Sequence, residues 1–513
     1  MITLQNVSFR YGTGGDASGG VREVDLHIRK GDCVVLCGRS GCGKTTLTRL
    51  VNGLIPHFYE GVLSGEVRVG GRDSAARSLA KTAEIVGSVF QNPRSQFFNV
   101  DTTGELAFGC ENQGLPREEI LRRVDGARVL FGLDGLMDRS IFELSGGEKQ
   151  RIACGSVYAA GPEVYVLDEP SANLDAGATE KLRQILAALK ARGKTLLISE
   201  HRLYYLAELA DMYLYMEDGR VTRALDRREM RALPPGERAA MGLRSLDLNG
   251  ADYRGRAAAP RDGGALLIEN LVCRRGRRRV LDIPRLSLPS GEILAVVGAN
   301  GAGKSTFAHC LGGILRHKGT FSVDGKALSD KKRVEMSYMV MQDVSRQLFT
   351  ESVLEELSLG RREAPVKEAE DLLRALGLYE LRDKHPMALS GGQKQRLAVA
   401  AAAFAGKEIL LYDEPTSGLD AVNMRRICAL IQDMADRVFI TAVITHDLEF
   451  ILSCCTSVLE LSGGTVTDHY ALDGPGVEKI KRHFLKEVVN YETKGNSGKT
   501  ENRHGAAAGA GGY

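Results

Sequence analysis

The chain has 513 residues, of which 43% are hydrophobic and 26% are charged. This length exceeds that of one ordinary domain, and the composition is typical of a compact α/β protein rather than of a disordered or fibrous one. Lys plus Arg (68) nearly balance Asp plus Glu (65), so the net charge of +3 gives no general electrostatic case for binding nucleic acid or an anionic membrane.

No apolar segment is long enough to predict a membrane-spanning helix, which needs roughly 18 to 20 apolar residues. The longest apolar run, residues 397–405, reaches about half that length. The first residues, MITLQNVSFRYG, lack the basic start and apolar stretch of a secretory signal. The 10 cysteines are scattered without a CxxC pair or a Cys/His cluster, so we expect reduced thiols rather than disulfides or a cysteine metal site.

Five short stretches occur twice in the chain, in the same order. The pairs are GRSGCGKTT and GANGAGKST, VFQNPRSQFF and VMQDVSRQLF, ELSGGEKQR and ALSGGQKQR, YVLDEPSANLD and LLYDEPTSGLD, and LLISEH and AVITH. Such a repeat predicts a duplicated domain. Because residues 223–264 are rich in Arg, Pro, Gly and Ala, we expect a linker there, between domains at 1–222 and 265–490. The polar, Gly-rich segment 491–513 is predicted to be a disordered tail.

The predicted elements follow one order in both halves. A short apolar run, CVVLCG or ILAVVG, leads into a glycine-rich loop and then a helical pattern. YVLDE and ILLYDE are predicted as buried strands that end in carboxylates, and TLLIS and TAVIT as further strands. This pattern favours an α/β fold with a mainly parallel sheet, in which ligands bind at the strand ends.

Residues 38–45 and 298–305 both fit the phosphate-loop pattern GxxxxGK[ST]. In such a loop the backbone N–H groups surround phosphates at a helix N-terminus, the lysine reaches the β and γ oxygens, and the hydroxyl binds Mg²⁺. A flexible glycine loop could match this pattern once by chance. Two matches, each after an apolar strand, indicate two nucleotide sites.

Paired carboxylates close the strands that follow in each half. Asp168 and Asp413 can hold Mg²⁺, and the adjacent Glu169 and Glu414 can orient the attacking water. A single Asp-Glu pair could instead be an ordinary helix cap. Its recurrence beside each phosphate loop favours the catalytic interpretation.

The LSGGE and LSGGQ segments each begin a predicted helix, so hydroxyl and N–H groups there can bind a further anion. Phosphate loop, glutamine loop, LSGG, acidic strand end, SANLD or SGLD, and a single His, in that order, resemble the ATP-binding-cassette (ABC) ATPases. The resemblance covers nearly the whole chain apart from linker and tail. It implies two P-loop domains, each with a mainly parallel core sheet, an antiparallel β subdomain and a helical subdomain.

The resemblance also implies that the two halves pair head-to-tail and hold two ATP molecules with Mg²⁺ between them. The implied catalytic residues are Gln91, Glu169, His201, Gln342, Glu414 and His446. The implied Mg²⁺ ligands are Thr45, Gln91, Asp168, Ser305, Gln342 and Asp413. The implied ATP-binding residues are Tyr11, Gly38, Ser40, Gly41, Gly43, Lys44, Thr45 and Thr46, then Gly298, Asn300, Gly301, Gly303, Lys304, Ser305 and Thr306. Ser390, Gly391 and Gly392 would close the first site, and Ser145, Gly146 and Gly147 the second.

The halves differ where the family stacks an aromatic ring on adenine, because Tyr11 aligns with Arg275. Arg275 could stack through its guanidinium plane or be a solvated charge. Cys42 lies within the first phosphate loop, where a thiol could make the site sensitive to modification or could simply serve as a small residue.

The segments after the two glutamines resemble those of the energy-coupling-factor (ECF) importer ATPases. In that family this region forms a groove for a membrane subunit, which implies that the chain powers uptake of a vitamin, its precursor or a metal ion from the cytoplasmic face of the membrane. Asp101 and Glu105 could then meet basic groups of the partner, although core packing is the alternative for the aromatic side chains. The candidate groove residues are Gln96, Phe97, Phe98, Gln347, Leu348 and Phe349.

Two alternatives stay open. One is a ribosome-associated tandem cassette, from which we would expect a long charged helical linker, and the other is a tandem sugar-importer ATPase. We expect membrane transporter subunits as partners and no nucleic acid. The intact acidic pairs predict that both sites hydrolyse ATP.

Overall fold

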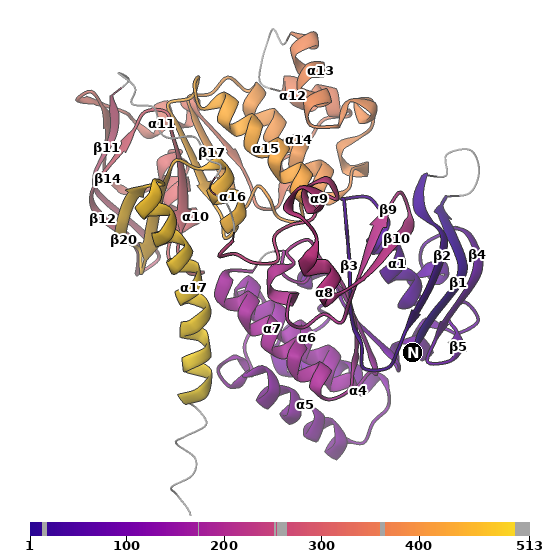
Figure 1. Cartoon of the computed structure of the whole chain (residues 1–513). Helices are drawn as coiled ribbons and strands as arrows, with labels where there is room; N and C mark the ends of the chain where they lie inside the picture. Colours follow the sequence, from indigo (N-terminus) through magenta and orange to yellow (C-terminus); the bar gives the residue numbers. More distant parts are fainter. Residues whose placement is uncertain (13–17, 173, 251–252, 254–263, 360–364, 498–513) are drawn as a thin grey trace, which may run out of the picture.

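The computed structural model describes residues 1–12, 18–172, 174–250, 253, 264–359 and 365–497. These residues form two cassettes of the same topology, each with an antiparallel sheet, a six-stranded sheet and a group of helices (Figure 1). The predicted α/β fold with two P-loop domains is confirmed.

The first cassette contains sheets of strand order β2-β1-β4-β5 and β10-β9-β3-β8-β7-β6. In the larger sheet β9, β3, β8, β7 and β6 are parallel, and only β10 is antiparallel to its neighbour. The smaller sheet comprises β1 (Ile2–Tyr11), β2 (Ser18–Ile28), β4 (Gly61–Val69) and β5 (Arg72–Asp73). The larger comprises β3 (Cys33–Gly38), β6 (Val86–Val89), β7 (Val164–Asp168), β8 (Thr195–Ser199), β9 (Met212–Glu217) and β10 (Arg220–Asp226).

The second cassette repeats this arrangement, with orders β12-β11-β14-β15 and β16-β17-β18-β13-β19-β20. Its antiparallel sheet comprises β11 (Ala265–Arg275), β12 (Arg278–Pro289), β14 (Lys318–Val323) and β15 (Lys326–Ala327). Its larger sheet comprises β13 (Glu292–Val297), β16 (Ser337–Val340), β17 (Ile409–Asp413), β18 (Ile440–Ile444), β19 (Ser457–Ser462) and β20 (Thr465–Ala471). The predicted strands CVVLCG, ILAVVG, TLLIS and TAVIT are thus confirmed, and they are fully buried because both sheet faces are covered.

Equivalent helices lie in equivalent places in the two cassettes. They pair as α1 (Lys44–Val51) with α10 (Lys304–Leu311), α3 (Leu79–Ala83) with α11 (Asp330–Met336), α4 (Thr102–Asn112) with α12 (Val353–Ser358), α5 (Arg117–Phe131) with α13 (Val366–Ala375), α6 (Gly146–Ala160) with α14 (Gly391–Phe404), and α7 (Ala176–Ala191) with α15 (Ala421–Met434). The short helices α2 (Leu54–His57) and α16 (Leu448–Cys454) occur in one cassette each. In Figure 1, α4 and α5 lie at the lower end and α12 and α13 at the upper end, so the cassettes run in opposite directions.

Part of the predicted linker is folded. From the end of β10 the linker forms two short helices, α8 (Arg227–Ala232) and α9 (Pro235–Ala240). Asp226 caps the N-terminus of α8 through a capping box. Beyond α9 the chain enters the interface between cassettes, and Arg244 is 3% exposed. Arg244 pairs with Asp447 and Glu449 of the second cassette, while Arg39 donates to the carbonyl of Ala240. The linker therefore contacts both cassettes.

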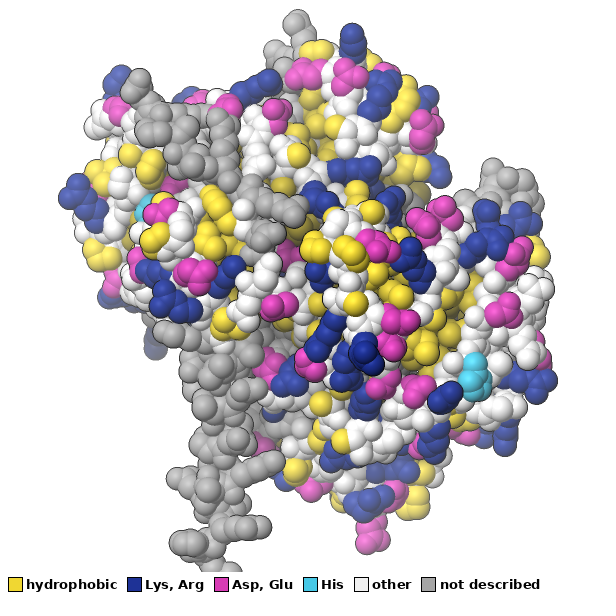
Figure 2. Space-filling view, in the orientation of Figure 1, with side chains coloured by type: hydrophobic (Ala, Val, Ile, Leu, Met, Phe, Trp, Pro, Cys, Tyr) yellow, Lys and Arg dark blue, Asp and Glu magenta, His cyan; other side chains and the backbone are white. Residues whose placement is uncertain are grey.

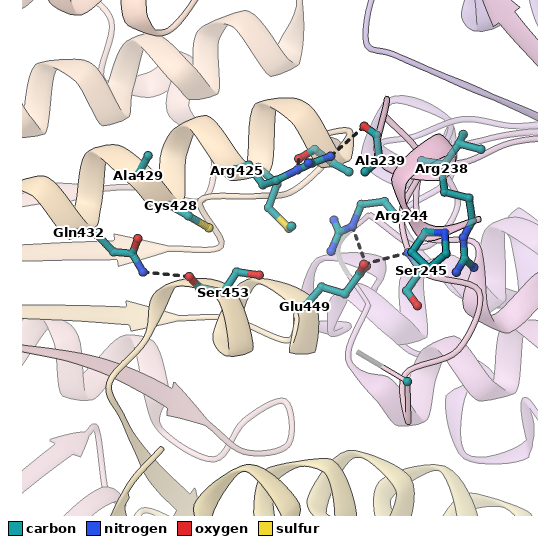
Figure 3. A pocket seen from close by; sticks show the side chains of 15 residues that line it. Arg238, Ala239, Arg244, Ser245, Arg425, Cys428, Ala429, Gln432, Glu449 and Ser453 are labelled. Atoms are coloured by element: carbon teal, nitrogen blue, oxygen red, sulfur yellow. Dashed lines mark hydrogen bonds and ion pairs between the residues drawn. The ribbon is translucent and has the colours of Figure 1, made fainter. Parts of the chain in front are cut away.

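This linker segment also borders a cavity of about 310 Å³ against α15 and α16. Figure 3 shows Arg244 and Ser245 directed at Glu449, and Arg425 directed at the carbonyl of Ala239. These bonds join α9 and the segment after it to the second cassette.

The last described element, α17 (Gly474–Ser497), extends beside α7 of the first cassette (Figure 1). Its final turns occupy residues 491–497, where the sequence predicts the start of a disordered tail. Residues 498–513 of that predicted tail lie outside the described part of the chain.

None of the helices in the described residues is long and apolar enough to cross a membrane. All ten cysteines are buried free thiols. On the face seen in Figure 2, basic and acidic side chains are interspersed, as the nearly balanced composition indicates.

Candidate active sites

Both phosphate loops connect a buried central strand to the first turn of a helix. Gly38 requires its glycine because φ is +139° and a Cβ there would lie 2.3 Å from the carbonyl oxygen of Met216. Lys44 is buried, and its Nζ donates to the carbonyls of Gly38 and Arg39, each at 3.1 Å. Lys304 repeats this contact, with 2.6 Å to the carbonyl of Gly298.

The first acidic residue of each pair faces the hydroxyl of its phosphate loop. Thr45 Oγ1 donates to Asp168 Oδ1 at 3.4 Å, and Ser305 Oγ donates to Asp413 Oδ2 at 3.1 Å. Burial raises the pKa of both aspartates. A hydroxyl beside a carboxylate is an oxygen pair of the kind that Mg²⁺ prefers.

The second acidic residue of each pair lies at a left-handed backbone position, with φ of +46° at Glu169 and +52° at Glu414. Such a conformation is uncommon for a residue other than glycine and is characteristic of functional sites. Burial raises the pKa of Glu169 to about 8, with a further contribution from Asp168. Burial likewise raises the pKa of Glu414 to about 7, against an opposing effect of Arg202. These groups can therefore take up a proton near neutral pH.

A histidine follows the next strand in each cassette. Nε2 of His201 lies 3.6 Å from Oε1 of Glu169, and Nε2 of His446 lies 3.9 Å from Oε1 of Glu414. Burial lowers the pKa of both histidines well below the usual value, and the phosphate-loop lysines act in the same direction. Both imidazoles are therefore neutral at pH 7 and have one donor and one acceptor nitrogen.

The first site brings together residues of both cassettes around a cavity of about 590 Å³. Its lining includes the predicted catalytic residues of the first cassette and the predicted LSGG residues of the second: Lys44, Thr45, Gln91, Asp168, Glu169, His201, Ser390, Gly391 and Gly392. Asp420 of the second cassette accepts a hydrogen bond from the backbone N–H of Ser40 at 2.6 Å. The head-to-tail arrangement is thus present at this site.

The second site surrounds a cavity of about 520 Å³ and is arranged differently. Its lining includes Lys304, Ser305, Gln342, Asp413, Glu414 and His446. Ser145, Gly146 and Gly147 do not line this cavity. Here the bond equivalent to that between Ser40 and Asp420 runs from the backbone N–H of Asn300 to Asp175 Oδ2 and is longer, at 3.4 Å. The second site is therefore less closed than the first.

The base end of the first cavity includes residues that the sequence analysis missed. Tyr11 lines the cavity as expected, together with Tyr59 and Arg49. The Arg49 guanidinium lies 4.0 Å from the centre of the Tyr59 ring, and Nη1 donates to the Tyr11 hydroxyl at 2.9 Å. The aromatic pair in the segment Phe58-Tyr59, close after the phosphate-loop helix, could have indicated this wall. Arg275 lines the second cavity at the equivalent place.

Of the candidate groove residues, only one phenylalanine in each cassette is largely exposed: Phe98 (74%) and Phe349 (73%). Phe97 packs against the core and Leu348 is buried. Gln96 and Gln347 accept from the backbone N–H groups of Phe90 and Met341, so they stabilise the glutamine loops.

The acidic neighbours have structural roles that the sequence did not predict. Glu105 is 2% exposed and accepts from the backbone N–H groups of Phe98 and Asn99. Asp101 caps α4 by accepting from Gly104. The prediction that Glu105 meets a partner is wrong, because its carboxylate fixes the turn that carries Phe98.

Cys42 is 6% exposed, and burial raises the pKa of its thiol although Lys44 acts in the opposite direction. The protonated thiol is a weak nucleophile. Cys42 thus serves as a small core residue of the phosphate loop.

Comparison with known proteins identifies the class to which this fold and these sites belong. The family model described as "ABC transporter" matches residues 21–172 and 281–417. The chain belongs to the ABC transporter family, as a tandem ATPase with two cassettes that binds and hydrolyses ATP.

Two proteins of Treponema denticola are similar to this chain over nearly its full length. One is 46% identical over 91% of this chain and 96% of its own, and the other is 40% identical over 92% and 98%. A Methanosarcina mazei protein is 34% identical over 93% of this chain and 89% of its own. All three bear the name "Putative ABC transporter ATP-binding protein".

The tandem fold is also found in an archaeal ribosome recycling factor, aABCE1, solved in complex with the ribosomal stalk protein aP1. The match covers 93% of this chain and 92% of that chain, with a TM-score of 0.63 and 21% sequence identity. ABCE1 in a ribosome-bound model with archaeal Pelota gives a TM-score of 0.67, also at 21% identity. At this identity the likeness shows the fold alone.

Proposed function

We propose that this ATPase powers the import of a micronutrient, such as a vitamin, a vitamin precursor or a metal ion, through separate integral membrane subunits at the cytoplasmic face of the membrane. The observation that carries the proposal is a matched pair of exposed apolar patches. The first patch is the exposed Phe98 and Phe142, with the half-buried Phe108 stacked on Phe98, and the second is the exposed Phe349, Leu359 and Met387.

The two patches lie at equivalent positions of the two repeats. Phe98 and Phe349 each follow the glutamine loop, and Phe142 (78% exposed) and Met387 (48% exposed) each precede the LSGG segment. Phe98 stacks on Phe108 with ring centres 4.9 Å apart. Exposed apolar groups at equivalent places favour a partner that presents two similar apolar segments, such as the cytoplasmic helices of a membrane subunit.

The first patch is connected to the catalytic centre through the glutamine loop. Gln91 donates through Nε2 to Glu169 Oε2 at 2.6 Å, and the loop then continues to Phe98. The buried carboxylate of Glu105 holds the backbone of Phe98 in place. A partner that moves Phe98 can therefore displace Gln91 relative to Glu169.

The chemistry that we propose for each site rests on the donor set. The Lys44 ammonium is buried, and its hydrogen-bond partners are carbonyl oxygens and a thiol, so an anionic phosphate would neutralise it. Thr45, Gln91 and Asp168, and likewise Ser305, Gln342 and Asp413, would hold Mg²⁺, which supplies charge stabilisation when bound.

Within this scheme Glu169 and Glu414 orient the attacking water and accept its proton. His201 and His446, being neutral, can donate one hydrogen bond to the γ-phosphate without adding charge. Ser390, Gly391 and Gly392 complete the first site, and Ser145, Gly146 and Gly147 would complete the second after further closure of the cassettes.

A test compares affinity capture by the tagged chain from detergent-solubilised native membranes. The wild type is compared with Phe98→Ala plus Phe349→Ala, and with the control Leu121→Ala plus Val366→Ala, which removes exposed aliphatic side chains from α5 and α13. We expect wild type and control to capture the same polytopic membrane proteins and the phenylalanine variant to lose them at equal ATP binding.

Capture of ribosomal components in place of membrane proteins would overturn the transport role and favour the ribosome-associated alternative. Unchanged capture of membrane proteins by the phenylalanine variant would show that the patches are not the docking surface.

A further inference from the structure

The two nucleotide sites share their phosphate ends but differ at their base ends. The base end of the first cavity is lined by the two rings of Tyr11 and Tyr59 and by Arg49, whose guanidinium lies over the Tyr59 ring and donates to the Tyr11 hydroxyl. The corresponding part of the second cavity is lined by Arg275, Arg278 and Arg279. The first site thus offers two aromatic rings, with its one arginine held against them, whereas the described lining of the second offers three arginines and no Phe, Tyr or Trp.

The described residues that line the second cavity include no Phe, Tyr or Trp. In the first cassette the segment between α1 and β4 contributes Phe58 and Tyr59. In the second, the segment between α10 and β14 is GGILRHK up to the first strand residue and contains no Phe, Tyr or Trp. The second cassette therefore lacks an aromatic residue at the equivalents of both Tyr11 and Tyr59.

The arginines lie on a tight hairpin. β11 ends at Arg275 and β12 begins at Arg278, so only Gly276 and Arg277 form the turn, with Gly276 at φ +57°. Arg275 is directly opposite Arg278 across the hairpin, and Arg274 is opposite Arg279.

Like charges directly opposite each other on neighbouring strands destabilise a sheet. Arg279 pairs with Asp282, but within the described residues no carboxylate contacts the side chain of Arg275 or Arg278. Both of these side chains are exposed and line the cavity. Two uncompensated guanidinium groups beside a phosphate loop are therefore suited to an electron-rich ligand.

The hydrogen-bonding pattern of the bases determines which nucleotide these groups favour. An arginine fork has only donors. Guanine presents two adjacent acceptors, O6 and N7, whereas adenine presents the acceptor N7 beside the donor N6 amino group. A guanidinium can therefore form two hydrogen bonds with guanine and only one with adenine along this edge.

We propose that the second site binds guanine nucleotides as well as adenine nucleotides, contacting the base through Arg275 and Arg278, and hydrolyses GTP in addition to ATP. Water attacks the γ-phosphorus, the bond to the β–γ bridging oxygen breaks, and GDP, inorganic phosphate and a proton are released, with Glu414 as the first proton acceptor. This inference rests on the site residues proposed above and is independent of the membrane role.

The test measures each site separately in the full chain. Lys44→Ala disables the first phosphate loop and Lys304→Ala the second, and calorimetric titration with AMP-PNP and GMP-PNP gives the ratio of the two dissociation constants at the remaining site. We expect the dissociation constant of GMP-PNP divided by that of AMP-PNP to be at least about fivefold lower in Lys44→Ala than in Lys304→Ala, because the remaining second site favours guanine.

Substitutions on the hairpin then identify the responsible groups. Adding Arg275→Tyr and Arg278→Ala to Lys44→Ala should return the ratio to that of the first site, whereas adding Arg285→Ala, an exposed arginine of β12 outside the cavity lining, should not. Thermal unfolding of every variant checks its fold. Equal ratios at the two sites, no binding of either nucleotide in Lys44→Ala, or a ratio insensitive to the hairpin substitutions would overturn the proposal.

Discussion

Nε2 of Gln91 lies 2.6 Å from Oε2 of Glu169. Gly418 of the second cassette packs against both side chains. A Cβ at Gly418 would lie 2.9 Å from Oε2 of Glu169 and 3.0 Å from Nε2 of Gln91. The second cassette therefore controls the space around the carboxylate of the first site. Its SGLD segment contributes contacts as well as the LSGG segment.

Gly418→Ala should lower hydrolysis at the first site, by about tenfold or more, because the methyl group displaces Glu169 or Gln91. Phosphate release measured in the Lys304→Ala background reports this site alone. Gly406→Ala is the matched control, since Gly406 also has a positive φ (+62°) but no atom near its would-be Cβ. Equal losses in both variants would assign the effect to backbone strain instead.

The contribution of Glu169 and Glu414 to the stability of the nucleotide-free protein should fall as pH rises. The pKa values of Glu169 and Glu414, about 8 and 7, lie above the ordinary value of 4.5. Between pH 4.5 and these raised values, each glutamate is more protonated in the folded state than in the unfolded state. Their contribution is fully present below pH 4.5 and is lost as pH rises through 7 and 8. Glu169→Gln plus Glu414→Gln should therefore gain several kcal/mol of stability relative to the wild type between pH 5 and 9, because a difference of one pKa unit corresponds to about 1.4 kcal/mol. Parallel thermal-unfolding profiles across that range would contradict this assignment.

Removing the carboxylates should abolish turnover while leaving ATP binding intact. We expect Glu169→Gln plus Glu414→Gln to lower ATP hydrolysis by about 10² to 10⁴, the usual contribution of a general base. The single variants report whether both sites hydrolyse ATP, because each should retain the activity of the other site. If one single variant already loses all activity, the sites are coupled or only one is hydrolytic.

Arg244→Ala should destabilise the interface between the cassettes by about 3 to 5 kcal/mol, because it removes the cation that pairs with the buried carboxylate of Asp447 and the partly buried carboxylate of Glu449. Burial alone would raise the pKa of Asp447, but Arg244 and Arg202 outweigh this effect and lower it to about 2. Urea unfolding measures the loss. Arg231→Ala is the control, since Arg231 pairs with Glu208 at the exposed surface, where such a pair contributes less than about 1 kcal/mol. Similar losses in the two variants would argue against a role of the linker in joining the cassettes.

Thiol reagents should leave the first site active near neutral pH. Because burial raises the pKa of the Cys42 thiol, we expect iodoacetamide at pH 7 to leave ATP hydrolysis unchanged over the period in which small free thiols react. Mass spectrometry of the modified protein checks which cysteines react. Rapid inactivation that is prevented by Cys42→Ala would contradict this expectation.

Local motifs predicted most of the catalytic centre. Lys44, Asp168 and Glu169 are each specified within a few residues of a strand end, so their positions follow from the strand-loop-helix pattern. The strands themselves were predictable because both sheet faces are buried and their sequences are nearly continuous apolar runs.

Other features depend on contacts between distant segments. Glu105 looks like a surface carboxylate in sequence, but it turns inward to bind two backbone N–H groups. Arg244 lies in a segment rich in flexible residues, yet carboxylates about 200 positions away fix it. The absence of the segment Ser145-Gly146-Gly147 from the second cavity depends on the relative placement of the cassettes, for which the sequence carries no local signal.

The folded linker has a consequence for how the two nucleotide sites can diverge. Cassettes on separate chains associate at a rate that depends on protein concentration. In a homodimer, both cassettes are encoded by the same sequence, so every substitution occurs in both nucleotide sites. A covalent connection replaces that encounter by an intramolecular one with a fixed effective concentration, and Arg244 narrows the accessible orientations further. Each half can then change alone, so tyrosines at one base end and arginines at the other can coexist in every molecule.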